Sequence, residues 1–269
     1  MVLFKVTIKP KNSFQTGLKS TTLYGAMCCA IADMSSYGNE VLEDIVFKSN
    51  TALVLSDAFP SGYIASPTFK SDSKLSVMNT GTGEIETFGI VADKQQHCMV
   101  SRENNMSIKL REEVISYYDK PLDFYIMTDF FTKEDISEIV KVMLLKGIGR
   151  GRSIGRGCFE LIGIEEVQDI LSPELRSKQV GNIGYMVISD YIPNKTDSTI
   201  GSYTARIIRG ITRDGRQKKE VYVLNSGSSF VAKQNTPDSN VFTIGRLVKD
   251  EFTGTYTNGT AIAVKLGLN

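Results

Sequence analysis

The chain has 269 residues, of which 41% are hydrophobic and 23% are charged, and its formal net charge is +1. This length is sufficient for two domains of ordinary size with hydrophobic cores. The near-neutral charge excludes a surface that binds nucleic acid throughout, so any such contact has to be local.

The use of cysteine and histidine excludes further classes of site. The four cysteines form no C-x-x-C pair, which favours reduced core cysteines in a cytoplasmic protein. His97 is the only histidine, so a histidine-rich metal centre within the chain is excluded, and His97 has no evident catalytic partner. The apolar runs are too short for a membrane span, and we expect the N-terminus to be a strand and not a signal peptide.

The N-terminal part of the chain predicts strands and helices in alternation. Residues Val2–Ile8 alternate between apolar and polar side chains, which indicates a strand. Apolar residues recur at helical spacing over Thr21–Met34, and a shorter helical stretch covers Glu40–Lys48. The apolar run Ala52–Leu55 predicts another strand.

A long segment between Asp57 and Ser107 lacks a clear period, and Pro60, Pro67 and the G-T-G at Gly81–Gly83 interrupt it. A long stretch without regular structure inside a compact domain is usually functional or disordered. We therefore expect a loop-rich insertion here.

Regular patterns return after this insertion. Thr132 and Asp135 form a capping-box-like helix start, and Gly147 can cap the end of the same helix. The strands predicted around this helix are Glu113–Tyr118, Leu122–Met127 and Cys158–Ile164. The order strand–helix–strand–strand–helix–strand is that of a ferredoxin-like domain, which we assign to residues 1–168.

The second domain, residues 182–269, follows a predicted linker around Ser172–Gly181 and contains mostly strands. Asp214-Gly215 predicts a hairpin between the second and third of these strands. The expected strands are Tyr185–Ile188, Tyr203–Ile208, Val221–Leu224, Val241–Leu247 and Ala261–Leu266. The predicted fold class is therefore α+β.

A glycine-rich basic loop joins the predicted helix to the strand that follows it. From Gly147 to Gly157 there are five glycines, three arginines and no acidic residue. Glycines allow positive φ and close approach of a ligand, successive N–H groups can bind an anion, and arginines donate to phosphate in pairs. This composition favours phosphate binding, and a solvated surface loop is the alternative.

Three better-known glycine loops are excluded by their context. A P-loop and a dinucleotide-binding loop both follow a strand and precede a helix, and the glycine loop of a kinase joins two strands. Here the loop follows a helix and precedes a strand, and no glycine is followed by Lys-Ser or Lys-Thr. A phosphate-rich polymer is the ligand class that remains.

The start of the first predicted helix is a second candidate for phosphate contact. Lys19, Ser20 and Thr21 lie at this start, where we expect Ser20 or Thr21 to be the N-cap. Exposed N–H groups at a helix start also suit phosphate. We therefore include all three residues among the candidates for phosphate contact.

A third candidate is the basic hairpin at residues 206–219, which carries six basic residues and one acidic residue. Charges two residues apart share a face of a strand, so Arg206 and Arg209 are predicted to belong to a basic strip that could bind a phosphate-rich polymer. A charged edge that prevents aggregation is the alternative. The carboxylates elsewhere show no spacing typical of metal ligands or of an acid–base pair.

Three segments, taken together and in order, resemble one protein family. They are S-T-T-L-Y-G-A-M-C-C-A-I at Ser20–Ile31, L-S-D-A-F-P at Leu55–Pro60 and G-I-G-R-G-R-S-I-G-R-G-C-F-E-L at Gly147–Leu161. The family is that of the RAMP proteins of type III CRISPR effectors, and most closely the fourth subunit of the type III-A Csm complex. Thr21 and Tyr24 stand where this family usually has Asp and Phe.

The resemblance implies two ferredoxin-like, RRM-related domains, no catalytic activity and no cofactor. It also implies a ribonucleoprotein subunit that holds the 5′ repeat-derived tag of crRNA, between the large polymerase-like subunit and the adjacent backbone RAMP subunit. The RNA-contacting residues carried over from the family are Gly149, Arg150, Gly151, Arg152, Ser153 and Arg156.

Two other functions stay open. Related RAMP folds include metal-independent endoribonucleases that process crRNA precursors, and His97 is the only histidine that could act as a base. An assembly scaffold whose loops contact only protein is the other alternative.

Overall fold

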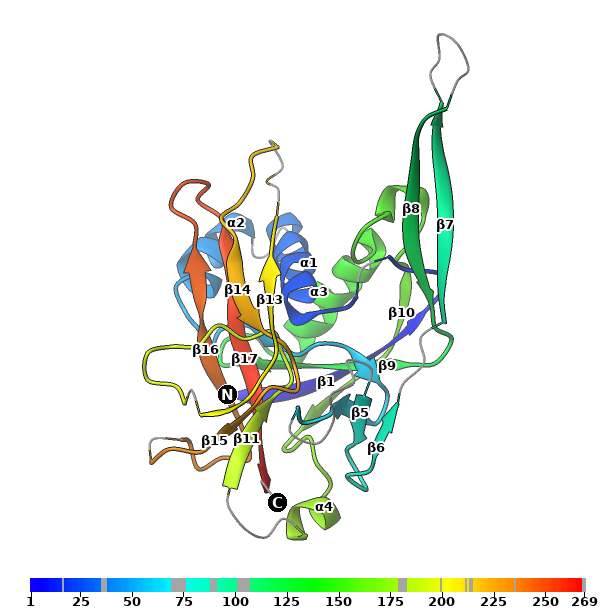
Figure 1. Cartoon of the computed structure of the whole chain (residues 1–269). Helices are drawn as coiled ribbons and strands as arrows, with labels where there is room; N and C mark the ends of the chain where they lie inside the picture. The colour runs from blue at the N-terminus through cyan, green and yellow to red at the C-terminus, as the bar shows by residue number, and fades with distance from the viewer. Residues whose placement is uncertain are drawn as a thin grey trace.

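Two five-stranded antiparallel sheets form the body of the protein (Figure 1). The computed structural model describes residues 1–15, 17–34, 38–68, 76–87, 91–100, 107–178, 183–198, 200–210, 212, 215–234 and 236–267. No helix within these residues is long and apolar enough to cross a membrane. The fold class is α+β, as predicted.

The first sheet has the strand order of a ferredoxin-like domain. Its elements along the chain are β1 (Val2–Pro10), α1 (Ser20–Asp33), β2 (Val54–Leu55), β3 (Phe59–Pro60), β9 (Leu122–Thr128), α3 (Lys133–Lys146) and β10 (Phe159–Val167). The order across the sheet is β10-β1-β9-β2, with β3 also paired to β9, and every pair is antiparallel. This arrangement confirms the prediction for the first half of the chain.

Local signals explain both ends of α3. The side chain of Thr132 accepts a hydrogen bond from the Asp135 N–H, and the Asp135 carboxylate accepts one from the Thr132 N–H, which completes the predicted capping box. Gly147 ends the helix with φ of 72°. The predicted helical stretch Glu40–Lys48 overlaps two short helices, α2 (Gly38–Val41) and η1 (Leu42–Val46).

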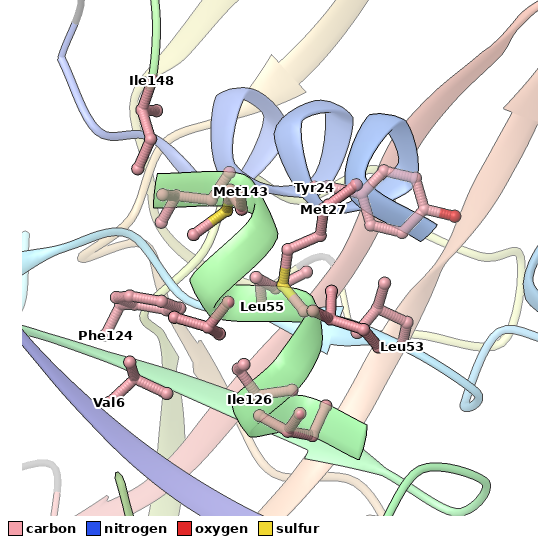
Figure 2. Packing of buried hydrophobic residues seen from close by; sticks show 14 of the residues in the cluster. Val6, Tyr24, Met27, Leu53, Leu55, Phe124, Ile126, Met143 and Ile148 are labelled. Carbon is pink, nitrogen blue, oxygen red and sulfur yellow. The ribbon is translucent and has the colours of Figure 1, made fainter. Parts of the chain in front are cut away.

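The central strand β9 is buried at every position because its two faces pack against different partners. Phe124 and Ile126 pack in one hydrophobic cluster with Met27 of α1 and Met143 of α3, as Figure 2 shows. Met127, on the opposite face, belongs to a second cluster.

This second cluster joins the two sheets. It contains Leu3 and Met127 from the first sheet and Met186 and Ile262 from the second. Because the hydrophobic core is shared, the division into domains at residues 1–168 and 182–269 stays a prediction.

The described residues of the insertion between Asp57 and Ser107 are mostly in strands, so the expectation of a loop-rich insertion was wrong for this part of the chain. It holds a small three-stranded sheet of β4 (Tyr63–Ala65), β5 (Ser76–Asn79) and β6 (Ile85–Thr87). The strands β7 (Val91–Val100) and β8 (Ser107–Tyr117) then form a long hairpin that projects from the body (Figure 1). Many residues of this hairpin are polar, which removes the alternation that marks a half-buried strand. His97 lies on β7, and its side chain is outside the described residues.

The second half is mostly β, as expected. Its elements are α4 (Pro173–Ser177), β11 (Ile183–Val187), β12 (Gly201–Ser202), β13 (Ala205–Ile208), β14 (Val221–Leu224), β15 (Ser229–Val231), β16 (Val241–Lys249) and β17 (Tyr256–Gly267). The sheet order is β12-β15-β11-β17-β16, and β13 and β14 form a separate hairpin, as predicted. This order does not repeat that of the first sheet, and no described residue from 183 to 267 is helical.

Candidate nucleic-acid interface

The glycine-rich loop between α3 and β10 depends on backbone conformations that side chains rarely adopt. The glycines with positive φ are Gly147 (72°), Gly149 (85°), Gly151 (82°), Gly155 (79°) and Gly157 (67°). Gly157 is also required for space, because a Cβ atom there would lie 2.1 Å from the carbonyl oxygen of Ile148. Glycine is therefore needed for the path of this loop.

The segment after β1 holds the C-terminal end of this loop in place. The N–H of Gly157 donates to the Ser13 carbonyl at 2.9 Å, and the N–H of Cys158 donates to Asn12 Oδ1 at 3.0 Å. The side-chain amide of Asn12 donates in turn to the carbonyl of Gly155. These three bonds connect parts of the chain about 145 residues apart and leave the middle of the loop outside the body.

The loop has a buried base and an exposed basic crest. Gly147 and Ile148 are buried, and Ile148 belongs to the core under α1 and α3 (Figure 2). Arg150, Arg152 and Ser153 are exposed, and we call these three residues the crest of the loop. A one-turn helix, η2 (Arg152–Ile154), shapes the crest between two glycines in the left-handed conformation.

The start of α1 is organised differently from the prediction. Neither Ser20 nor Thr21 is the N-cap, which is Lys19, and the Lys19 side chain makes no capping bond. The buried carboxylate of Asp57, which follows β2, accepts a hydrogen bond from the Ser20 N–H at 2.7 Å. The hydrogen-bonding need of the Ser20 N–H at the helix start is therefore met by a side chain that is distant in the sequence.

Asp57 also neutralises Lys19. The Lys19 Nζ donates to Asp57 Oδ2 at 2.6 Å, and the hydroxyl of Ser226 donates to the same oxygen at 2.6 Å. Burial by itself would lower the pKa of Lys19, but the charge and hydrogen bond of Asp57 outweigh it and raise this pKa. The carboxylate thus occupies the position that a phosphate could take at this helix start.

A second buried carboxylate, Asp190, completes this network. It accepts from the Thr21 hydroxyl at 2.8 Å and forms an ion pair with the Arg206 guanidinium, while its N–H donates to the Ser20 hydroxyl at 2.8 Å. Burial raises the pKa of Asp190, the nearby Asp57 charge adds to this, and Arg206 and Lys19 oppose it. We use the name α1-start network for Lys19, Ser20, Thr21, Asp57, Asp190, Arg206 and Ser226.

The predicted RNA-binding residues therefore fall into separate groups. Gly149, Arg150, Gly151, Arg152, Ser153 and Arg156 form the glycine-rich loop, and Lys19, Ser20, Thr21 and Arg206 form hydrogen bonds or ion pairs in the α1-start network. Arg209 is exposed and pairs with Glu220 at 2.8 Å. RNA contact by each of them stays a prediction.

Sequence reasoning missed four residues that organise these groups: Asn12, Asp57, Asp190 and Ser226. The S-D-A-F-P segment contains Asp57, but nothing local in the sequence pairs it with Lys19 or with Ser226. Asp57 and Asp190 are far apart in the sequence, and only the fold brings both carboxylates into the α1-start network. In the described part of the chain, no three His, Cys, Asp or Glu side chains are arranged to hold a metal ion.

Comparisons with known proteins show that the fold is one already seen in solved structures. No protein-family model matches the chain, and no curated protein sequence matches it. A chain in the crystal structure of a Csm3–Csm4 subcomplex of the type III-A CRISPR-Cas interference complex is similar, with 18% identity, a TM-score of 0.60 and full coverage of both chains. A chain in the Csm1–Csm4 cassette bound to AMPPNP has 16% identity and a TM-score of 0.61, with 100% of this chain and 99% of that chain covered. The likeness extends over both halves of the protein.

Proposed function

We propose that this chain is a Csm4-type RAMP subunit of a type III-A CRISPR interference complex. Csm4 is the subunit that the names of the two similar complexes have in common. The whole-length likeness supports this proposal, and so does the order of the Ser20–Ile31, Leu55–Pro60 and Gly147–Leu161 segments along the chain.

The proposed role of the subunit is to hold the 5′ repeat-derived tag of crRNA. The observation that carries this proposal is the exposed crest of Arg150, Arg152 and Ser153 on a glycine-rich loop with a buried base. Arginines and backbone N–H groups on such a loop donate to phosphates, and the bases of a single strand stay available for recognition by other groups.

We further propose that the subunit bridges the large subunit and the adjacent backbone RAMP subunit. One similar structure is of Csm4 with Csm3 and the other is of Csm4 with Csm1. A protein with this fold is therefore compatible with both neighbours, and we expect this chain to contact one homologue of each.

The test of RNA binding is the double variant Arg150→Ala with Arg152→Ala. Loss of two phosphate contacts should weaken binding of tagged crRNA about tenfold or more, and should make the remaining binding less dependent on salt. A filter-binding titration at several salt concentrations measures both effects.

The matched control removes the same charge from the exposed face of α3, with Lys133→Ala and Lys141→Ala. This variant should keep the affinity and the salt slope of the wild type to within about twofold. Equal losses of RNA affinity in both double variants would contradict a role for the loop. They would show that the affinity depends on the net charge of the protein and not on the position of the arginines.

We propose that the subunit is not catalytic. When wild-type protein and His97→Ala are incubated with labelled repeat RNA, neither should cleave it. Cleavage by the wild type that is lost in His97→Ala would favour the endoribonuclease alternative.

A further inference from the structure

The hairpin β13–β14 presents two chemically different faces. Ile207 and Tyr222 are directly paired across the strands and point to solvent, with 37% and 70% of their surfaces exposed. The neighbouring pair, Arg206 and Val223, points the other way, because side chains alternate along a strand. Val223 is fully buried and Arg206 pairs with Asp190.

The outer face therefore carries an apolar pair with a large part of its surface in contact with solvent. Leu224, next to Tyr222 on this face, is only partly buried. An exposed aromatic ring beside an aliphatic side chain is a flat surface on which a base or another planar group can stack.

The same hairpin is the most basic part of the second half. Residues 205–224 contain six basic and two acidic residues, a net charge of +4, whereas the whole chain carries +1. Arg209 continues the outer face and pairs with Glu220 at 2.8 Å, and both side chains are largely exposed. An exposed pair of this kind contributes little, so Arg209 can turn to a phosphate at small cost.

The hairpin is firmly attached at its base. Leu224 and Tyr191 exchange two backbone hydrogen bonds of 2.8 and 2.9 Å, and the N–H of Asn225 donates to the Thr204 carbonyl at 2.9 Å. The ion pair of Arg206 with Asp190 adds a side-chain contact to the α1-start network. The outer face is thus held in one orientation before any ligand binds.

This attachment also brings the hairpin near the glycine-rich loop. Asn12 and Ser13 hold the loop, and Lys19 and Ser20 belong to the α1-start network that anchors the hairpin. The residues from 13 to 19 can span at most about 25 Å when fully extended. The two basic elements therefore lie at the two ends of a short segment of chain.

We propose that the β13–β14 hairpin is a second RNA-binding element, on which an unpaired base stacks against Tyr222 and Ile207 while Arg209 binds an adjacent phosphate. Aromatic and basic side chains on one element are the combination that binds single-stranded nucleic acid. A polyanion matches the +4 charge of this hairpin better than a protein surface of mixed charge. The proposal rests on the proposed function, since it assumes that the chain binds single-stranded RNA.

The test compares Tyr222→Ala with Tyr222→Phe in the full-length protein. Loss of the ring should weaken binding of tagged crRNA about five- to a hundredfold, and Tyr222→Phe should restore it because the stacking surface returns. Fluorescence anisotropy with end-labelled RNA measures the affinity. Phe252→Ala, at an equally exposed aromatic residue of the β16–β17 turn, is the control and should bind like the wild type.

Each outcome separates this inference from the proposed function. If the wild type does not bind the RNA, the proposed function fails and the inference fails with it. If the wild type binds, Arg150→Ala with Arg152→Ala weakens binding and Tyr222→Ala does not, only the inference fails. Unchanged RNA affinity in Tyr222→Ala, together with loss of copurification with the large subunit, would also overturn it and identify the hairpin as a protein interface.

Discussion

The glycine-rich loop and the α1-start network both contain basic residues that the sequence assigns to RNA, yet they are built in different ways. In the loop, backbone geometry sets the shape, and Arg150 and Arg152 reach solvent from a segment without acidic residues. In the α1-start network, Lys19 and Arg206 pair with the buried carboxylates of Asp57 and Asp190. A basic residue near a helix start is therefore no evidence of a free phosphate site until its acidic neighbours are known.

The largest loss of stability and of RNA binding is expected when Gly157 is replaced by a residue with a side chain. Gly157→Ala would place Cβ against the Ile148 carbonyl and would force a residue with a side chain to adopt φ of +67°. We expect a loss of stability of about 3 kcal/mol or more, and loss of RNA binding, because the path of the loop changes. Urea unfolding and the RNA titration measure these effects.

Gly155→Ala is the matched control, because its φ is +79° and its Cβ would have no neighbour within 4 Å. It should cost only about 1 kcal/mol. Similar losses in the two variants would show that backbone conformation alone, and not the close contact at Gly157, limits the loop.

A smaller loss of stability is expected when Asp57 of the α1-start network is replaced. Asp57→Ala removes the carboxylate that accepts hydrogen bonds from the Ser20 N–H and the Ser226 hydroxyl, and it leaves Lys19 without this ion-pair partner. We expect a loss of about 2–3 kcal/mol in the free energy of unfolding, because Lys19 keeps part of its contact with water. RNA affinity of the folded variant should stay within about threefold of the wild type. A larger loss of affinity at unchanged stability would assign Asp57 to the RNA site itself.

The smallest effect is a pH dependence that comes from Asp190. Burial raises the pKa of this carboxyl in the folded protein, so its contribution to stability is complete below the pKa of the unfolded state and is lost as pH rises through the folded pKa. The variant Asp190→Asn cannot titrate. The stability of the wild type relative to this variant should therefore decrease as pH rises from about 4 towards neutrality, in urea unfolding at matched pH values. A difference that increases with pH would show that Arg206 and Lys19 dominate over burial.

The hydrophobic period along the sequence predicted much of the first sheet. Local signals also located both ends of α3, because a capping box and a C-terminal glycine act within a few residues. The prediction failed in the insertion after Asp57, where β7 and β8 pair with each other in a long projecting ribbon. Strands of that kind do not alternate clearly, so periodicity cannot reveal them.

The sequence by itself determined the glycine-rich loop, because positive φ and basic charge are properties of the residues that carry them. It also determined the cap of α3 and the β13–β14 hairpin, whose signals are local. Only the tertiary structure decided that Asp57 accepts the hydrogen bond of the Ser20 N–H, that Asp190 pairs with Arg206, and that Ile207 and Tyr222 point to solvent together. The reason is physical: Asp57 lies 37 residues from Ser20 and Asp190 lies 170 residues from it, so these contacts and the burial that accompanies them arise only when the two sheets pack.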